Sequence, residues 1–162
     1  MGYLRNMGKQ ILINDEIKVV LFTLQMIYDL QEKTNMPVSE LIYSLTGEKT
    51  RELAVKCIIK FMFGLDVNDN YEYYSYILLS TYIEQLKYKN MPKPRSNDDD
   101  SDYEFINIEY WFYIGTVVLG YSEDKVWNMT LGQLRTLHNE HLKYHGVIKE
   151  DKEVSIDEAI PF

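Results

Sequence analysis

Three histidines near the end of the chain come closest to a chemical site. His138, His141 and His145 are spaced i, i+3 and i+7, so on a helix they share one face. His141 and His145 have a spacing at which two imidazoles can bind Zn²⁺ from a helix. Leu131 and Leu134 run into the same face, which favours a helix-packing seam or a subunit contact. A metal-binding helical protein is therefore the lesser hypothesis, and no metal site is assigned.

The single cysteine, Cys57, excludes an internal disulfide framework and a multi-cysteine zinc site. It stands among Val55, Ile58 and Phe61, an apolar setting that favours an inert thiol. The sequence has no phosphate-binding glycine loop, nucleophile elbow or EF-hand pattern. We therefore expect no enzyme activity, no catalytic residues and no cofactor.

Charge and aromatic content indicate the class of partner. The 162 residues carry a net charge of −8 and include 14 Tyr, 7 Met and 2 Trp. Nucleic acid is a disfavoured partner because phosphate recognition depends on Lys and Arg. Tyr is enriched at protein interfaces because it joins a large contact area to a polar tip. The composition thus favours a protein that binds another protein, and a homo-oligomer stays open.

A membrane location is not expected. The most apolar run, Phe105 to Tyr121, has 17 residues and includes Asn107 and Glu109, whereas a spanning helix needs about 20 apolar residues. We expect a buried core helix there instead. The first ten residues also lack the apolar stretch of a secretory signal, so a cytoplasmic location is expected.

The first elements are predicted from two β-rich runs. Ile11–Ile13 and Ile17–Phe22 flank the polar Asn14-Asp15-Glu16, which favours a hairpin. A helix that starts at Asp15 is the alternative, because the apolar residues from Val19 onward also fit helical spacing. We favour the hairpin, followed by a helix from Thr23 to Lys33.

Three more helices are predicted before the composition changes. The first spans Glu40 to Leu45 with Ser39 as its N-cap, the second residues 48–64, and the third residues 71–89. The expected buried side of the second helix is Leu53, Val55, Cys57, Ile58, Phe61 and Met62. The expected apolar face of the third helix is Tyr73, Tyr76, Ile77, Leu79, Tyr82, Ile83 and Leu86.

A linker divides the chain. Residues 90–104 hold two prolines, two serines and five acidic side chains, a composition typical of linkers. We therefore predict a hairpin plus helical N-terminal domain over 1–89, a C-terminal helical segment over 105–148, and an acidic tail over 149–162. The predicted fold class is mainly α: a short N-terminal β-hairpin followed by a helical bundle, with a second small helical segment after the linker.

Helix start and stop signals organise the second segment. One helix is predicted from Ile108 to Leu119, ending at Gly120. Ser122 is the expected cap of a short helix. Thr130 and Gln133 fit a capping box, which starts a helix that runs to about Tyr144.

Two segments resemble a known family. Residues 10–43, with a strand, polar turn, strand and helix followed by Thr34 to Leu41, resemble the N-terminal part of phage tail assembly chaperones; Asn14-Asp15 replaces the glycine of that family's turn. Residues 110–145 resemble the C-terminal motif of small tail-morphogenesis proteins of long-tailed phages from Gram-positive hosts. The second motif is the step Gly120, Ser122, Trp127, Met129 and Thr130.

The resemblance implies a non-enzymatic role. Such proteins bind the tape-measure protein in the host cytoplasm, keep its long apolar helices soluble and help to recruit the major tail protein. Adaptable Met and Tyr side chains suit such a client, and the negative charge favours solubility. A structural virion component, such as a tail or connector subunit, is the alternative. We expect the partner-binding residues in the second segment: Tyr110, Trp111, Trp127, Met129, Leu134, His138 and His141. If they do not bind a partner, Trp111 and Trp127 are expected to be core anchors of the second segment.

Overall fold

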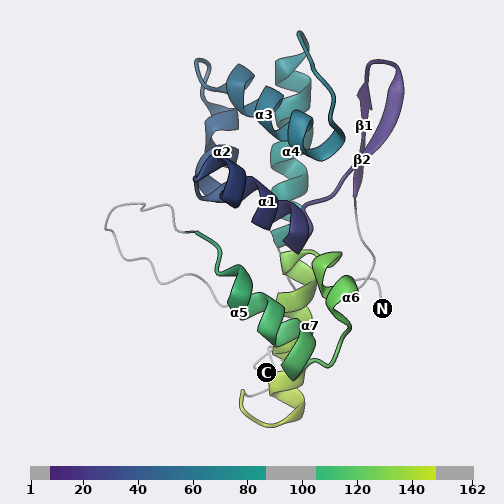
Figure 1. Cartoon of the computed structure of the whole chain (residues 1–162), viewed down its shortest axis with the longest axis vertical. Coiled ribbons are helices and arrows are strands. Elements are labelled where there is room, and N and C mark those ends of the chain that lie inside the picture. Colours follow the sequence, from purple (N-terminus) through teal and green to yellow (C-terminus); the bar gives the residue numbers. More distant parts are fainter. Residues whose placement is uncertain (1–7, 87–104, 149–162) are drawn as a thin grey trace, which may run out of the picture.

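The computed structural model describes residues 8–86 and 105–148. Of these residues 64% are helical, in seven α-helices preceded by a two-stranded antiparallel hairpin (Figure 1). The predicted fold class is confirmed. The predicted linker and acidic tail lie outside the described residues, and the division into domains stays a prediction.

The hairpin joins β1 (Lys9–Ile13) and β2 (Glu16–Val20). Asn14 and Asp15 form the turn with φ of 48° and 65°, the left-handed conformation that a two-residue hairpin turn requires. One face of the hairpin is buried through Ile11, Ile13 and Val20. The hairpin prediction is confirmed, and the alternative of a helix from Asp15 is wrong.

The next two helices differ in how they begin. α1 (Leu24–Thr34) starts at Thr23, whose hydroxyl accepts a hydrogen bond from the Met26 amide. α2 (Val38–Tyr43) follows Pro37 and has no side-chain cap. The prediction of Ser39 as the N-cap is therefore wrong. The helix starts before Ser39 because the fixed φ of proline already suits a helix start. A 3-10 turn, η2 (Ser44–Thr46), continues α2.

The buried face of α3 (Arg51–Phe63) differs from the predicted one. Leu53 is 72% exposed, whereas Ala54 and Ile59, which the prediction omitted, are buried beside Val55 and Ile58. The helix packs against α1 and η2 as well as α4, so neighbouring positions are buried in pairs. The remaining predicted residues, Cys57, Phe61 and Met62, are half-buried at its edge.

The buried face of α4 (Tyr71–Leu86) was predicted only in part: Tyr82 is buried and Ile77 and Leu79 are half-buried as expected. Tyr73, Tyr76 and Ile83 are exposed, and the buried side contains small polar residues. Ser75 and Thr81 can be buried there because each hydroxyl donates to a carbonyl of the preceding turn of the same helix, which leaves no polar group unpaired. The residues that turn inward are Tyr74, Ser75, Leu78, Thr81, Tyr82 and Gln85.

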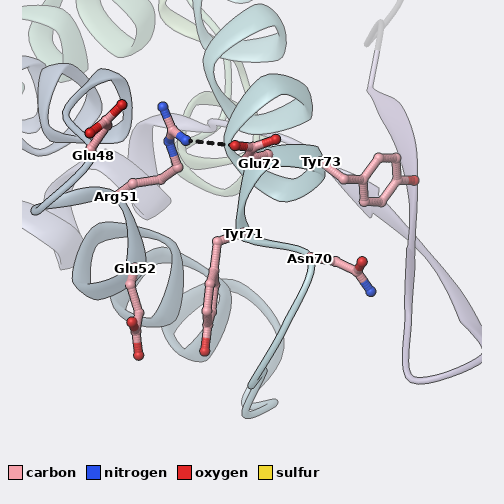
Figure 2. A pocket seen from close by; sticks show the side chains of 7 residues that line it. All are labelled: Glu48, Arg51, Glu52, Asn70, Tyr71, Glu72 and Tyr73. Atoms are coloured by element: carbon pink, nitrogen blue, oxygen red, sulfur yellow. Dashed lines mark hydrogen bonds and ion pairs between the residues drawn. The ribbon is translucent and has the colours of Figure 1, made fainter.

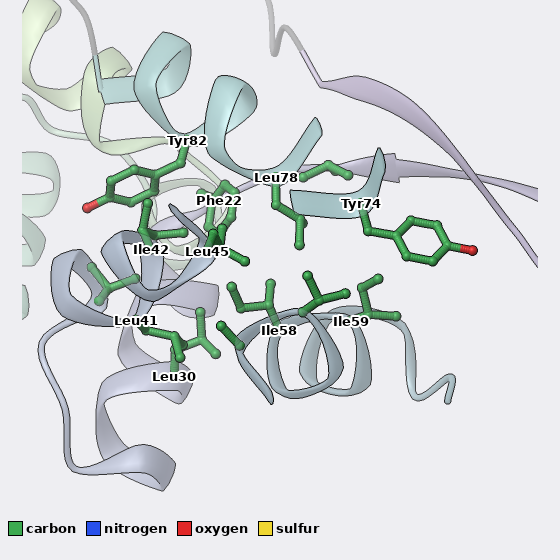
Figure 3. Close-up of a cluster of buried hydrophobic side chains, with 14 of the residues drawn as sticks. Phe22, Leu30, Leu41, Ile42, Leu45, Ile58, Ile59, Tyr74, Leu78 and Tyr82 are labelled. Carbon is green, nitrogen blue, oxygen red and sulfur yellow. The ribbon is translucent and has the colours of Figure 1, made fainter. Parts of the chain in front are cut away.

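An aliphatic core lies between α4, α3 and the α1–α2 pair (Figure 3). Tyr82 meets Phe22 edge to face, with ring centroids 5.2 Å apart. Gln85 pairs with the chain that leaves the hairpin: its Oε1 accepts from the Phe22 amide at 2.6 Å and its Nε2 donates to the Val20 carbonyl. The hairpin is therefore attached to α4 by polar as well as apolar contacts.

The second segment contains three α-helices, α5 (Ile108–Tyr113), α6 (Glu123–Trp127) and α7 (Leu131–Tyr144), and a π-helical turn, η3 (Ile114–Val118), after α5. The Ser122 cap and the Thr130–Gln133 capping box are confirmed. The expectation of a buried core helix over 105–121 is wrong, because only Ile114 and Gly115 of that run are buried.

The two segments meet where α1 and α7 begin. Thr23 and Thr130, the N-caps of these helices, form an isolated β-bridge, and the Leu24 amide donates to the Met129 carbonyl at 2.8 Å. Leu131 enters the aliphatic core of the first segment. Within the described residues, no helix is long and apolar enough to cross a membrane.

Candidate partner-binding surface

The outer side of α5 and η3 exposes three apolar residues in one row. Tyr110, Tyr113 and Val117 are 46%, 54% and 63% exposed, and their spacing of three and four positions places them on one side of a helix. We call this row the α5 face. It begins one turn after Asn107, whose side chain accepts from the Tyr110 amide at 2.9 Å and so fixes the helix start.

Gly115 allows the inner side of the same segment to pack closely. A Cβ atom at this position would lie 2.7 Å from both methyl groups of Val126 and 3.2 Å from a methyl group of Leu134. η3 also widens here, because the Leu119 amide donates to the Ile114 carbonyl, five residues earlier. The absent side chain lets η3 approach α6 and α7, and the α5 face consequently points outward.

Trp111 and His138 connect α5 to α7. Their rings are edge to face with centroids 6.2 Å apart, and the Arg135 guanidinium carbon lies 5.6 Å from the Trp111 ring centroid. Burial, and secondarily the neighbouring His141, lower the pKa of His138 below its ordinary value. The environment of His138 thus favours the neutral imidazole.

Trp127 connects α6 to α1 and α5. Its ring centroid lies 4.7 Å from that of Phe112 and 5.8 Å from that of Tyr28. Both tryptophans are half-buried, so each packs against the core and also reaches the surface.

The predicted contact residues divide into three groups. Tyr110 is exposed, and Trp111, Trp127, His138 and His141 are half-buried. Met129 and Leu134 are only 7% and 0% exposed, so Leu134 is closed to a partner in this structure, whereas Met129 still lines a hollow beside α6 and α7. Burial assigns these two to the core, because they complete the small cluster around Val126.

Sequence reasoning missed two residues of the α5 face, Tyr113 and Val117. Their spacing from Tyr110 was a usable signal, but the apolar run around them suggested burial on all sides. Phe105, which precedes α5, is also 52% exposed.

The three histidines do not converge. His141 and His145 have ring centroids 4.4 Å apart, whereas His138 faces Trp111. Among the described residues, no three His, Cys, Asp or Glu side chains are grouped so that they could hold a metal ion. Cys57 is half-buried, and burial raises the pKa of its thiol, which opposes nucleophilic reactivity.

One hollow adjoins the α5 face, and another is lined by residues of the first segment only. The first, of about 340 Å³, lies between α1 and the start of α5, where Phe105 and the carboxylates Glu32 and Glu109 line it. Gln31 fixes its inner wall, because its amide both donates to and accepts from the Ile106 backbone at 3.1 and 2.9 Å. The α5 face therefore has an apolar row with an acidic hollow at its N-terminal end.

The other hollow, of about 560 Å³, lies between α3 and α4 (Figure 2). Its charged side chains pair across it: Arg51 Nη1 lies 3.5 Å from a Glu72 carboxylate oxygen. Glu52 pairs with Lys56, whose hydrogen bond lowers the pKa of the Glu52 carboxyl. The Arg51–Glu72 pair connects α3 to α4, whereas Glu52 and Lys56 pair within α3. We assign no binding role to this hollow.

Comparison with known proteins gives no relative: no family model matches the chain, and no curated protein or solved structure is significantly similar to it.

Proposed function

We propose that this protein is a non-enzymatic tail assembly chaperone of a long-tailed bacteriophage. It would bind the tape-measure protein in the host cytoplasm and help to recruit the major tail protein. One observation carries the proposal: the α5 face, an exposed apolar row on a helix whose opposite side is held in the fold.

The α5 face suits a client that is itself helical. An apolar row at helical spacing packs against another amphipathic helix through contacts repeated every three or four residues. Two of its three residues are tyrosines, which supply contact area at low entropic cost and remain compatible with water when no client is bound. A tape-measure protein consists largely of such helices, as the resemblance implies.

Charge beside the α5 face adds a preference. Glu32 and Glu109 line the adjoining hollow, and neither forms a salt bridge with another described residue. A client helix with Lys or Arg beside its apolar stripe would complement these carboxylates. The net charge of −8 would also keep the complex soluble.

The order of elements supports the same proposal. The strand, turn, strand and helix of residues 9–34 occur in the order that the resemblance implies. Thr130 and Trp127, two residues of the second motif, occupy structural positions as a helix cap and an aromatic anchor.

Co-expression with the tape-measure protein encoded in the same genome tests the proposal. We expect the two proteins to co-purify, and we expect Tyr113→Ala with Val117→Ala to weaken binding by about tenfold or more because both residues are exposed on the α5 face. Tyr144→Ala with Val147→Ala is the matched control, because these residues are 88% and 68% exposed elsewhere.

Two results would contradict the proposal. Failure to co-purify with the tape-measure protein would remove the chaperone role. Stoichiometric recovery of the chain from purified virions by mass spectrometry would favour the structural virion component instead.

A further inference from the structure

The hairpin has one covered edge and one open edge. β1 lies beside α4, where the Tyr73 hydroxyl accepts from the Leu12 amide and Lys9 pairs with Glu84 at 2.8 Å. β2 has β1 as its only strand partner among the described residues. It is therefore the edge at which another strand could add.

The register shows which backbone groups face outward from β2. Ile13 and Glu16 close the two-residue turn, and such a closing pair exchanges both of its hydrogen bonds. The pairs then alternate, so the amides and carbonyls of Ile17 and Val19 point away from β1. No other described residue hydrogen-bonds to them.

The side chains at this edge are apolar and exposed. Ile17 is 68% exposed and Val19 is 54% exposed, next to Leu12 at 50% on the same face of the hairpin. Monomeric proteins usually protect an edge strand with Pro, a bulge or inward-pointing charge. β2 has neither Pro nor a bulge, but Lys18 lies on its inner face beside Val20 and pairs with Glu16 of the same strand at 2.6 Å. What a second strand would meet at this edge is the open backbone of Ile17 and Val19 and their exposed side chains.

We propose that a second copy of this chain pairs with β2, antiparallel to it, to form a four-stranded sheet across a two-fold axis. The charges of the segment Glu16-Ile17-Lys18 complement those of the same segment running in the opposite direction. With Ile17 opposite Ile17 of the other copy, each Glu16 lies opposite a Lys18.

The charges select this register over its neighbours. Only registers that align the outward groups of Ile17 and Val19 can form the new hydrogen bonds. Centring the pair on Lys18 would place two ammonium groups opposite each other, which is unfavourable. A register with Val19 opposite Val19 would leave neither Glu16 nor Lys18 opposite a residue of opposite charge. The Ile17 register alone gives two attractive pairs.

We expect a weak, exchanging dimer. One pair of short strands buries less area than the roughly 1,200–2,000 Å² of a typical stable complex. The dimer should therefore appear in sedimentation equilibrium as a mass that rises with protein concentration.

A charge swap tests both the pairing and its register. Glu16→Lys alone and Lys18→Glu alone each place like charges opposite each other, so each should weaken self-association by about tenfold or more. An equal mixture of the two variants should associate again, because Lys faces Glu at both pairs. The double variant Glu16→Lys with Lys18→Glu should dimerise like the natural chain.

An edge substitution tests which strand is used. Ile17→Pro removes the amide of β2 that the proposed register pairs with the other copy and that the hairpin does not use, so it should abolish the dimer. Gln10→Pro is the matched control, because the register gives Gln10 an outward amide on β1. Circular dichroism and thermal unfolding establish whether each variant is folded. If a proline variant does not fold, the charge-swap variants still test the proposal.

Three results would overturn the proposal. One is a natural chain that is monomeric at every concentration. Another is a dimer that neither the charge variants nor Ile17→Pro weaken, since it must form elsewhere. The third is slow hydrogen exchange at the Ile17 and Val19 amides only when a client protein is bound, because the edge would then pair with the client.

Discussion

The two segments are stabilised in different ways. The first has a continuous aliphatic core in which Leu30, Val55, Ile58 and Leu78 are completely buried. The second has a cluster of only four buried residues, one of which, Leu24, comes from the first segment. Half-buried side chains surround that cluster, among them the aromatic residues Trp111 and Phe112 of α5 and Trp127 of α6. The second segment thus depends on the first for part of its own core.

Because of this dependence, most of the stability lies in the first segment, whereas the proposed client surface lies in the second. Elements with few buried apolar contacts open at lower free energy than a continuous core. The α5 face belongs to such an element and can adjust to a client while the first segment stays folded. The comparison leads to four predictions.

The largest effect is expected in the first core. Ile58→Ala should lower the free energy of unfolding by about 2–5 kcal/mol, because it leaves a cavity between α3 and α4. Leu53→Ala on the same helix is the control, and its 72% exposure predicts a change within about 0.5 kcal/mol. Urea unfolding measures both, and equal losses would mean that α3 buries a different face.

The buried phenol of Tyr82 should make the stability of the first segment depend on pH in the alkaline range. Burial raises the pKa of Tyr82 from 10.0 to about 12, so its phenol deprotonates in the unfolded chain before it does so in the folded protein. The contribution of Tyr82 to stability is fully present below pH 10 and is lost as the pH rises from 10 toward 12, by up to about 3 kcal/mol. Tyr82→Phe should remove most of this slope in urea unfolding, whereas Tyr113→Phe, on the exposed α5 face, should leave it unchanged.

A smaller and more local effect is expected at Gly115. Gly115→Ala forces η3 away from Val126 and should cost about 1–3 kcal/mol. Hydrogen exchange should accelerate in α5 and α6 but not in α3. Val117→Ala, two residues away and 63% exposed, is the control. Faster exchange throughout the chain would show that the two segments unfold as one unit.

Local signals made much of this fold predictable from sequence. The Asn14-Asp15 turn and the caps at Ser122 and Thr130 act within a few residues, so their types determine the structure there. The buried faces of α3 and α4 depended instead on which helices pack around them. Counting apolar residues consequently misplaced Leu53 and Tyr76. The candidate surface depends on tertiary contacts in the same way, because burial of Leu134 and exposure of Val117 both follow from the close approach at Gly115.

The smallest effect is expected at His138, where the second segment should respond to acid before the first. Burial lowers the pKa of His138 below 6.5, so the unfolded chain binds a proton before the folded one. Its contribution to stability is present above pH 6.5 and is lost as the pH falls below that value. Amide exchange in α5 and α7 should therefore accelerate as the pH falls below 6.5, after correction for intrinsic rates, while α3 stays protected. His138→Gln should flatten the response because its side chain does not titrate. An unchanged response in this variant would show that the acid sensitivity does not come from His138.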